Sequence, residues 1–114
     1  DHVSRRKGPA LDFKLPLATP VFAAMPGNIV MAGSYIDWGN YVRISHGNVA
    51  EAGGFLETGY AHLGRILANV GDYAMETAHI GDSGSTGDST GPHLHFEVWL
   101  NGVRVDPAPY LGLA

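Results

Sequence analysis

Glycine and proline interrupt this chain too often for a long helix to form. The 114 residues include 16 glycines and 7 prolines, which divide the sequence into short runs bounded by turns. Short alternating apolar runs favour β-strands over helices. We therefore expect a single domain, residues 1–114, with a compact, mainly antiparallel all-β fold and a substrate groove over one sheet. The expected strands cover residues 10–13, 20–24, 28–32, 41–45, 55–63 and 93–100.

Turn signals between these runs predict local connections. Met25-Pro26-Gly27 predicts a hairpin between the runs at 20–24 and 28–32, and a second hairpin is expected between 70–73 and 78–81. The strand that begins at 41 is expected to break at 46–48, and residues 64–69 are expected to form a short helix or turn. Asn101-Gly102 predicts a tight hairpin that returns through 103–106.

The run from His93 to Leu100 is the most informative strand. Successive side chains on a strand point to opposite faces. Leu94, Phe96, Val98 and Leu100 therefore form an apolar back. The front carries His93, His95, Glu97 and Trp99. Two imidazoles one pleat apart allow one to hold a metal ion while the other reaches the water beside it, and the Gly/Ser/Thr-rich segment before them lets backbone approach a ligand.

Further candidate zinc ligands and bases lie elsewhere in the chain. His62 lies in a Tyr-Ala-His segment, and Asp12 follows a Gly8-Pro9 turn. Catalytic zinc usually has three protein ligands and a water. The helical zinc-protease signature His-Glu-x-x-His and the Gly-x-Ser-x-Gly nucleophile motif are both absent, and the chain has no cysteine. A metal-assisted hydrolysis with histidine bases remains the chemistry that these residue types favour.

Composition excludes several classes of protein. A formal net charge of −4 argues against nucleic acid as a partner. No apolar stretch approaches the roughly 18 residues of a membrane span. The polar start lacks a secretion signal, as expected of a domain excised from a longer protein or of a phage lysin. We expect the domain to act as a monomer.

Six segments in order resemble the lysostaphin-type (LytM-like) zinc metallopeptidases. They are Thr19–Ala24, Gly39–Ile44, Tyr60–Leu63, Ile80–Gly87 with its Gly-Ser-Thr-Gly, Thr90–Glu97 with its Gly-Pro-His-Leu-His-Phe-Glu, and Asp106-Pro107. The resemblance covers roughly Pro9 to Leu111. It implies an all-β fold with a groove floored by a sheet, and cleavage of peptides in bacterial peptidoglycan. It also implies that Zn²⁺ is bound by Asp12 and His95, and that His62 and His93 assist the attacking water and the developing oxyanion.

The sequence departs from this family at one position. The usual first zinc ligand is a histidine four residues before the aspartate, and Gly8 stands there. His2 is the only histidine before Asp12. In one interpretation, which we favour, His2 replaces the missing ligand on a longer loop. In the other, the zinc site is broken and the domain binds the cell wall or regulates other wall hydrolases.

Five other side chains have candidate roles. Tyr41 and Tyr60 are candidates for the substrate groove, although buried aromatic residues are the simpler interpretation. Glu97 is either a partner that orients an imidazole or a surface carboxylate. His46 is expected to be structural and His79 to be exposed.

The leading hypothesis is thus a zinc endopeptidase that acts on peptidoglycan peptides at the bacterial cell wall. A phage endolysin or tail-associated lysin and a bacterial wall hydrolase both suit such a domain. Glycyl bridges and diaminopimelate-type links both remain open as the scissile bond.

Overall fold

The computed structural model describes residues 9–87 and 89–110, and these form one antiparallel sheet. Its strands in the described part of the chain are β1 (Leu11–Phe13), β2 (Pro20–Phe22), β3 (Gly27–Tyr35), β4 (Gly39–Val49), β5 (Gly54–Ile66), β6 (Tyr73–Ala74), β7 (His79–Ser83), β8 (Leu94–Leu100) and β9 (Val103–Val105). The helices there are two short 3-10 turns, η1 (Ala50–Ala52) and η2 (Ala108–Tyr110). The prediction of an all-β antiparallel fold is confirmed. Within these residues no helix has the length or the apolar character needed to cross a membrane.

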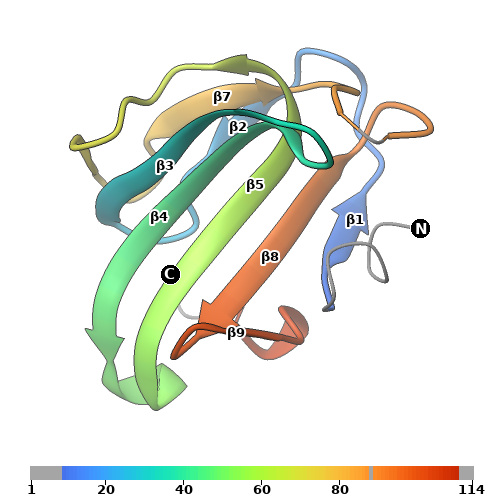
Figure 1. The fold of residues 1–114 in the computed structure, drawn as a ribbon. Helices are drawn as coiled ribbons and strands as arrows, with labels where there is room; N and C mark the ends of the chain where they lie inside the picture. The colour runs from blue at the N-terminus through green and yellow to red at the C-terminus, as the bar shows by residue number, and fades with distance from the viewer. Residues whose placement is uncertain (1–8, 88, 111–114) are drawn as a thin grey trace.

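The strands run in the order β1-β8-β5-β4-β3-β6, and Figure 1 shows β3, β4, β5 and β8 side by side in a curved layer. Strand β5 is long enough to pair with two strands in turn on the side away from β4. Its first half pairs with β8, and its last residues pair with β7, which in turn pairs with β2. The short β1 covers the outer edge of β8. This arrangement brings β1, β5 and β8 together at one end of the sheet.

The core lies on the side of β8 that the alternation predicts. Phe96 and Val98 are buried in the main apolar cluster, and Leu94 and Leu100 pack against it. Val21 of β2 and Ile80 of β7 belong to the same cluster, which explains why these two strands fold behind the sheet in Figure 1. The opposite side of β8 is therefore free to carry polar side chains.

Both predicted hairpins in the first and third quarters of the chain are wrong. Strand β2 pairs with β7, and β3 pairs with β4 and β6. Gly27, interpreted as part of a turn, instead begins β3, where a side chain would collide with the backbone of Ser45. The Met25-Pro26-Gly27 sequence changes the chain direction, but pairing with distant strands decides the partners.

The lengths of β4 and β5 also differ from the prediction. Strand β4 continues through 46–48 because a bulge at Ser45/Gly47 absorbs the irregularity. Strand β5 extends to Ile66, so no helix begins at residue 64. The helix was expected because Leu63, Ile66 and Leu67 have the spacing of an apolar helical face. Instead, Leu63 lies opposite Ser83 and Ile66 opposite Gly81 of β7.

The Asn101-Gly102 hairpin is confirmed. Asn101 and Gly102 have φ values of 51° and 81°. Two successive positive φ angles are the signature of a type I′ turn, which matches the twist of paired strands. The turn places Arg104 of β9 opposite Trp99 of β8.

Candidate active site

Asp12 and His95 face each other across the β1–β8 pair. They are direct partners in the antiparallel register, so their side chains share one face. Asp12 Oδ1 lies 3.1 Å from His95 Nδ1 and 3.4 Å from His93 Nε2. The His95 side chain is fully buried, whereas that of Asp12 is 39% exposed. One carboxylate oxygen therefore approaches both imidazoles of the His-Leu-His segment from the solvent side.

His62 reaches the same place through an irregularity in β5. It has a φ of 62°, which is uncommon for a residue other than glycine. The β4–β5 register shifts at this point, between the pairs Val42–Tyr60 and Asn40–Leu63. A bulge of this kind re-aims a side chain. The His62 ring centroid lies 4.9 Å from that of His93 and 5.7 Å from that of His95.

The loop after β7 fixes the orientation of two of these rings. His62 Nδ1 lies 2.7 Å from the Thr86 carbonyl oxygen, and His93 Nδ1 lies 2.9 Å from the Gly91 carbonyl oxygen. A carbonyl oxygen only accepts hydrogen bonds, so each bond requires a proton on Nδ1. In the neutral imidazole, Nε2 of each ring then carries the lone pair. Both rings are thereby prepared to accept a proton at Nε2.

Glu97 orients the third ring and is completely buried. Its Oε2 lies 3.1 Å from His95 Nε2, 2.7 Å from Trp38 Nε1 and 3.2 Å from an Arg104 guanidinium nitrogen. Burial on its own would raise the pKa of this carboxyl. The hydrogen bond with His95, the Arg104 charge and the hydrogen bond from Trp99 outweigh burial and lower the pKa to about 2. Glu97 is thus an ionised carboxylate at neutral pH, which settles the choice between an imidazole partner and a surface carboxylate.

The structure brings together four of the residues predicted for the site: Asp12, His62, His93 and His95. His2, the predicted third zinc ligand, lies outside the described residues. Within 9–87 and 89–110, no group of three or more histidine, aspartate or glutamate side chains has an arrangement that would hold a metal ion. The described residues therefore include two of the three predicted zinc ligands, Asp12 and His95.

The chemistry of that pair fits a metal ion. Because the ionised Glu97 accepts the hydrogen bond with His95 Nε2, a neutral His95 has its lone pair on Nδ1. That lone pair and the Asp12 carboxylate then face each other at 3.1 Å. Two acceptors at this distance repel unless a proton or a cation lies between them. An imidazole nitrogen and a carboxylate oxygen are ligands that zinc takes.

Tyr41 and Tyr60, the predicted substrate-binding residues, are both buried, although Tyr60 borders a small apolar pocket with Phe13, Val21 and Phe96. The side chains are 0% and 2% exposed. The Tyr41 hydroxyl donates to Glu97 Oε1 at 2.9 Å, and that of Tyr60 accepts from the Ala24 backbone N–H at 2.9 Å. Burial raises the pKa of both hydroxyls, so each stays protonated. The simpler interpretation of both as buried aromatic residues agrees with this placement.

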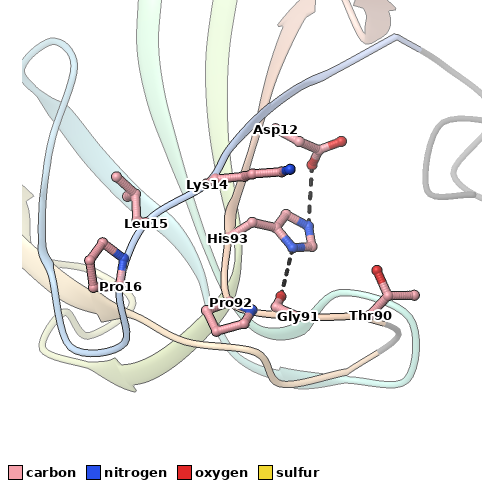
Figure 2. A pocket seen from close by; sticks show the side chains of 8 residues that line it. All are labelled: Asp12, Lys14, Leu15, Pro16, Thr90, Gly91, Pro92 and His93. Carbon is pink, nitrogen blue, oxygen red and sulfur yellow. Dashed lines mark hydrogen bonds and ion pairs between the residues drawn. The ribbon is translucent and has the colours of Figure 1, made fainter.

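A cavity of about 760 Å³ opens beside His93 (Figure 2). Asp12 and His93 form one side of it, and Lys14, the residue after β1, extends toward the same space. The remaining lining residues are Leu15, Pro16, Thr90, Gly91 and Pro92. Asp12 and His93 are therefore the residues of the candidate site that border this cavity.

Sequence reasoning missed Trp38 and Arg104 as partners of Glu97. Arg104 carried a usable signal, because the two-residue Asn101-Gly102 turn places it opposite Trp99 and hence on the face of Glu97. Trp38 carried none, because it lies in the β3–β4 turn and no local spacing relates it to β8. His46 is structural as expected, since its ring bridges the Pro26 carbonyl and the Thr58 hydroxyl at 2.8 Å each.

Comparison with known proteins places this geometry in one family. The sequence pattern of peptidase family M23 matches residues 6–107. The chain is 40% identical over 106 residues to peptidoglycan DD-endopeptidase ShyA of Vibrio cholerae, an alignment that covers 91% of this chain and 23% of ShyA. The chain spans about a quarter or less of the length of such curated relatives.

Solved structures show the same fold. The catalytic domain of lysostaphin from Staphylococcus simulans superposes with a TM-score of 0.78 at 37% identity, covering 90% of this chain and 77% of that one. A zinc-containing peptidase from Vibrio cholerae superposes with a TM-score of 0.77 at 35% identity, covering 85% of this chain and 28% of that one. With sequence identities of 37% and 35%, both proteins resemble this chain in sequence as well as in fold.

Proposed function

This chain belongs to peptidase family M23, and from that premise we propose that it is a zinc-dependent endopeptidase that hydrolyses peptides of bacterial peptidoglycan. The observation that carries the proposal is the convergence of Asp12, His62, His93 and His95 beside an open cavity. The relatives named above as a peptidoglycan endopeptidase and a zinc-containing peptidase support the substrate and the metal. The cell wall is then the place of action, reached by secretion or by phage delivery.

Asp12 and His95 are the residues that hold zinc in this proposal, with His2 as the third ligand. When bound, zinc supplies a Lewis acid that polarises the scissile carbonyl and acidifies water. His62 and His93 are the catalytic pair: with Nδ1 held by backbone carbonyls, each presents Nε2 for proton transfer to or from the water and the developing oxyanion. The cavity beside His93 receives the peptide.

The test is hydrolysis of purified peptidoglycan by the purified domain, followed through newly released amino groups. We expect hydrolysis that a chelator abolishes and that added zinc restores. Substrates with glycyl bridges and with diaminopimelate-type links, assayed in parallel, identify the scissile bond. No hydrolysis of either wall type by the zinc-supplemented protein would contradict the proposal.

One observation favours a second candidate, a non-catalytic module that binds the wall or regulates other hydrolases. Gly8 stands where the family resemblance implies a zinc-binding histidine. A protein of this second kind would sediment with peptidoglycan yet release no amino groups from it, with or without added zinc. The same preparation therefore separates the two candidates.

A further inference from the structure

The Glu97 cluster, which consists of Glu97 with Trp38, Tyr41, Trp99 and Arg104, is a second polar centre directly behind His95. Glu97 is 0% exposed, although a buried carboxylate without partners would be very costly. Its Oε1 accepts hydrogen bonds from the Tyr41 hydroxyl and from Trp99 Nε1, both at 2.9 Å. Its Oε2 faces Trp38 Nε1 and Arg104. Both oxygens are thus surrounded by groups that donate.

An aromatic and cationic cover closes this cluster from solvent. The Arg43 guanidinium carbon lies 4.2 Å from the centroid of the Trp99 ring, and Arg43 Nε donates to the Tyr41 hydroxyl at 2.9 Å. Trp38 stacks on Tyr41 with ring centroids 4.1 Å apart. The Tyr41 hydroxyl, which accepts from Arg43, must use its own proton toward Glu97. The cover therefore fixes the direction of the hydrogen bonds that end on the carboxylate.

The remaining contact of Glu97 is the one with the site. Oε2 lies 3.1 Å from His95 Nε2. A carboxylate whose other neighbours all donate can only accept here, so the proton of the neutral His95 ring is on Nε2. Nδ1 then has the lone pair and points at Asp12 Oδ1. A glutamine at position 97 would offer an N–H₂ group as well as an oxygen and would no longer enforce this choice.

We propose that Glu97 is a positioning residue for His95: its buried carboxylate holds the proton on Nε2 and so keeps Nδ1 available, facing Asp12, for the metal ion. The inference deepens the function proposed above and rests on it for the metal. Outer partners of this kind set the tautomer and the orientation of a ligating imidazole, and their loss typically weakens metal binding about 10–100-fold.

The first test uses the metal-free wild-type protein, so it does not depend on zinc binding. Ring ¹⁵N NMR in mildly alkaline buffer reports which nitrogen of a neutral histidine carries the proton, and the His95→Gln variant identifies the signal. We expect the Nε2–H tautomer in the wild type and a shift toward Nδ1–H in Glu97→Gln. An Nδ1–H tautomer in the wild type would overturn the inference.

The second test compares zinc affinity, measured by competition with a chromophoric chelator, in Glu97→Gln and Asp82→Asn. The matched control Asp82→Asn makes the same carboxylate-to-amide change at a residue that bonds with His79 and Arg65 and belongs neither to the site nor to the Glu97 cluster. We expect about 10–100-fold weaker zinc binding in Glu97→Gln, and affinity within about twofold of wild type in Asp82→Asn. Equal losses in both variants would mean that Glu97 acts only through stability. If the wild type binds no zinc while its His95 has the Nε2–H tautomer, the proposed function fails and the positioning by Glu97 stands.

Discussion

At the scale of single residues, His62, His93 and His95 each have a ring nitrogen held by a partner on a neighbouring segment or strand position. His62 and His93 use backbone carbonyls, and His95 uses the Glu97 carboxylate. The difference matters, because only His95 is coupled to an ionised and buried group. The division that we propose, between one metal-facing ring and two proton-transferring rings, rests on these partners rather than on the His-Leu-His spacing itself.

His46 makes a residue-scale prediction about stability. Burial lowers its pKa, against smaller opposing effects of the Pro26 carbonyl and of Glu57, whose carboxylate is also 3.7 Å from Arg43. The folded state therefore favours neutral His46. Below the ordinary histidine pKa of about 6.5 the unfolded chain binds more protons, so stability is lost as pH falls. We expect the unfolding free energy, measured with urea, to fall less steeply between about pH 7 and pH 5 in His46→Gln than in the wild type. Parallel pH profiles of the two proteins would contradict this.

At the scale of elements, the sequence predicts what local periodicity and turn chemistry control. The two faces of 93–100 and the Asn101-Gly102 hairpin follow from alternation and from positive φ, and both are as expected. The partners of β2, β6 and β7 do not follow, because they are chosen by contacts with distant strands. The prediction for the end of β5 was wrong for the same reason. The spacing of Leu63, Ile66 and Leu67 suits a helix, but pairing with β7 determines the conformation of this segment.

The loop between β7 and β8 gives an element-scale prediction. Gly87 has a φ of 71° and packs so tightly on Gly39 that a side chain would collide with its backbone. The carbonyl oxygen of Thr86, the preceding residue, holds His62 Nδ1. We expect Gly87→Ala to lose about 1–2 kcal/mol for the left-handed conformation and also to lose turnover, because the Thr86 carbonyl moves. The matched control is Gly47→Ala, which has a φ of 72° with open space around it.

Thermal unfolding and peptidoglycan hydrolysis distinguish the two glycine variants. Both are expected to be destabilised, and only Gly87→Ala should hydrolyse more slowly per folded molecule. Equal turnover in the two variants would mean that the loop does not position His62.

At the scale of the whole molecule, the site combines residues that are remote in sequence. Asp12 and His95 are separated by 83 positions and meet only because β1 pairs with the outer edge of β8. No spacing rule predicts that pairing. The roles of Asp12 and His62 came from the family resemblance, whereas the shared face of His93 and His95 could be derived from the strand itself. The bulge that turns His62 into the site has no signal in a single sequence.

The segment before β1 carries a whole-molecule prediction about the third ligand. If His2 replaces the family histidine missing at Gly8, His2→Ala should weaken zinc binding about as much as Asp12→Ala does. His79→Ala is the matched control, because His79 bonds with Asp82 away from the site. Chelator competition measures all three. Wild-type affinity in His2→Ala would show that another group completes the coordination.

The most direct test of the central claim measures zinc content and peptidoglycan turnover together in four alanine variants. We predict about one zinc per chain in the wild type, in His62→Ala and in His93→Ala, and little in Asp12→Ala and His95→Ala. Turnover should fall about 10²-fold or more in His62→Ala and His93→Ala despite retained metal, because each removes a proton-transferring group. Loss of zinc from His93→Ala with retention in His95→Ala would reverse the assignment, and full turnover in all four variants would contradict the site altogether.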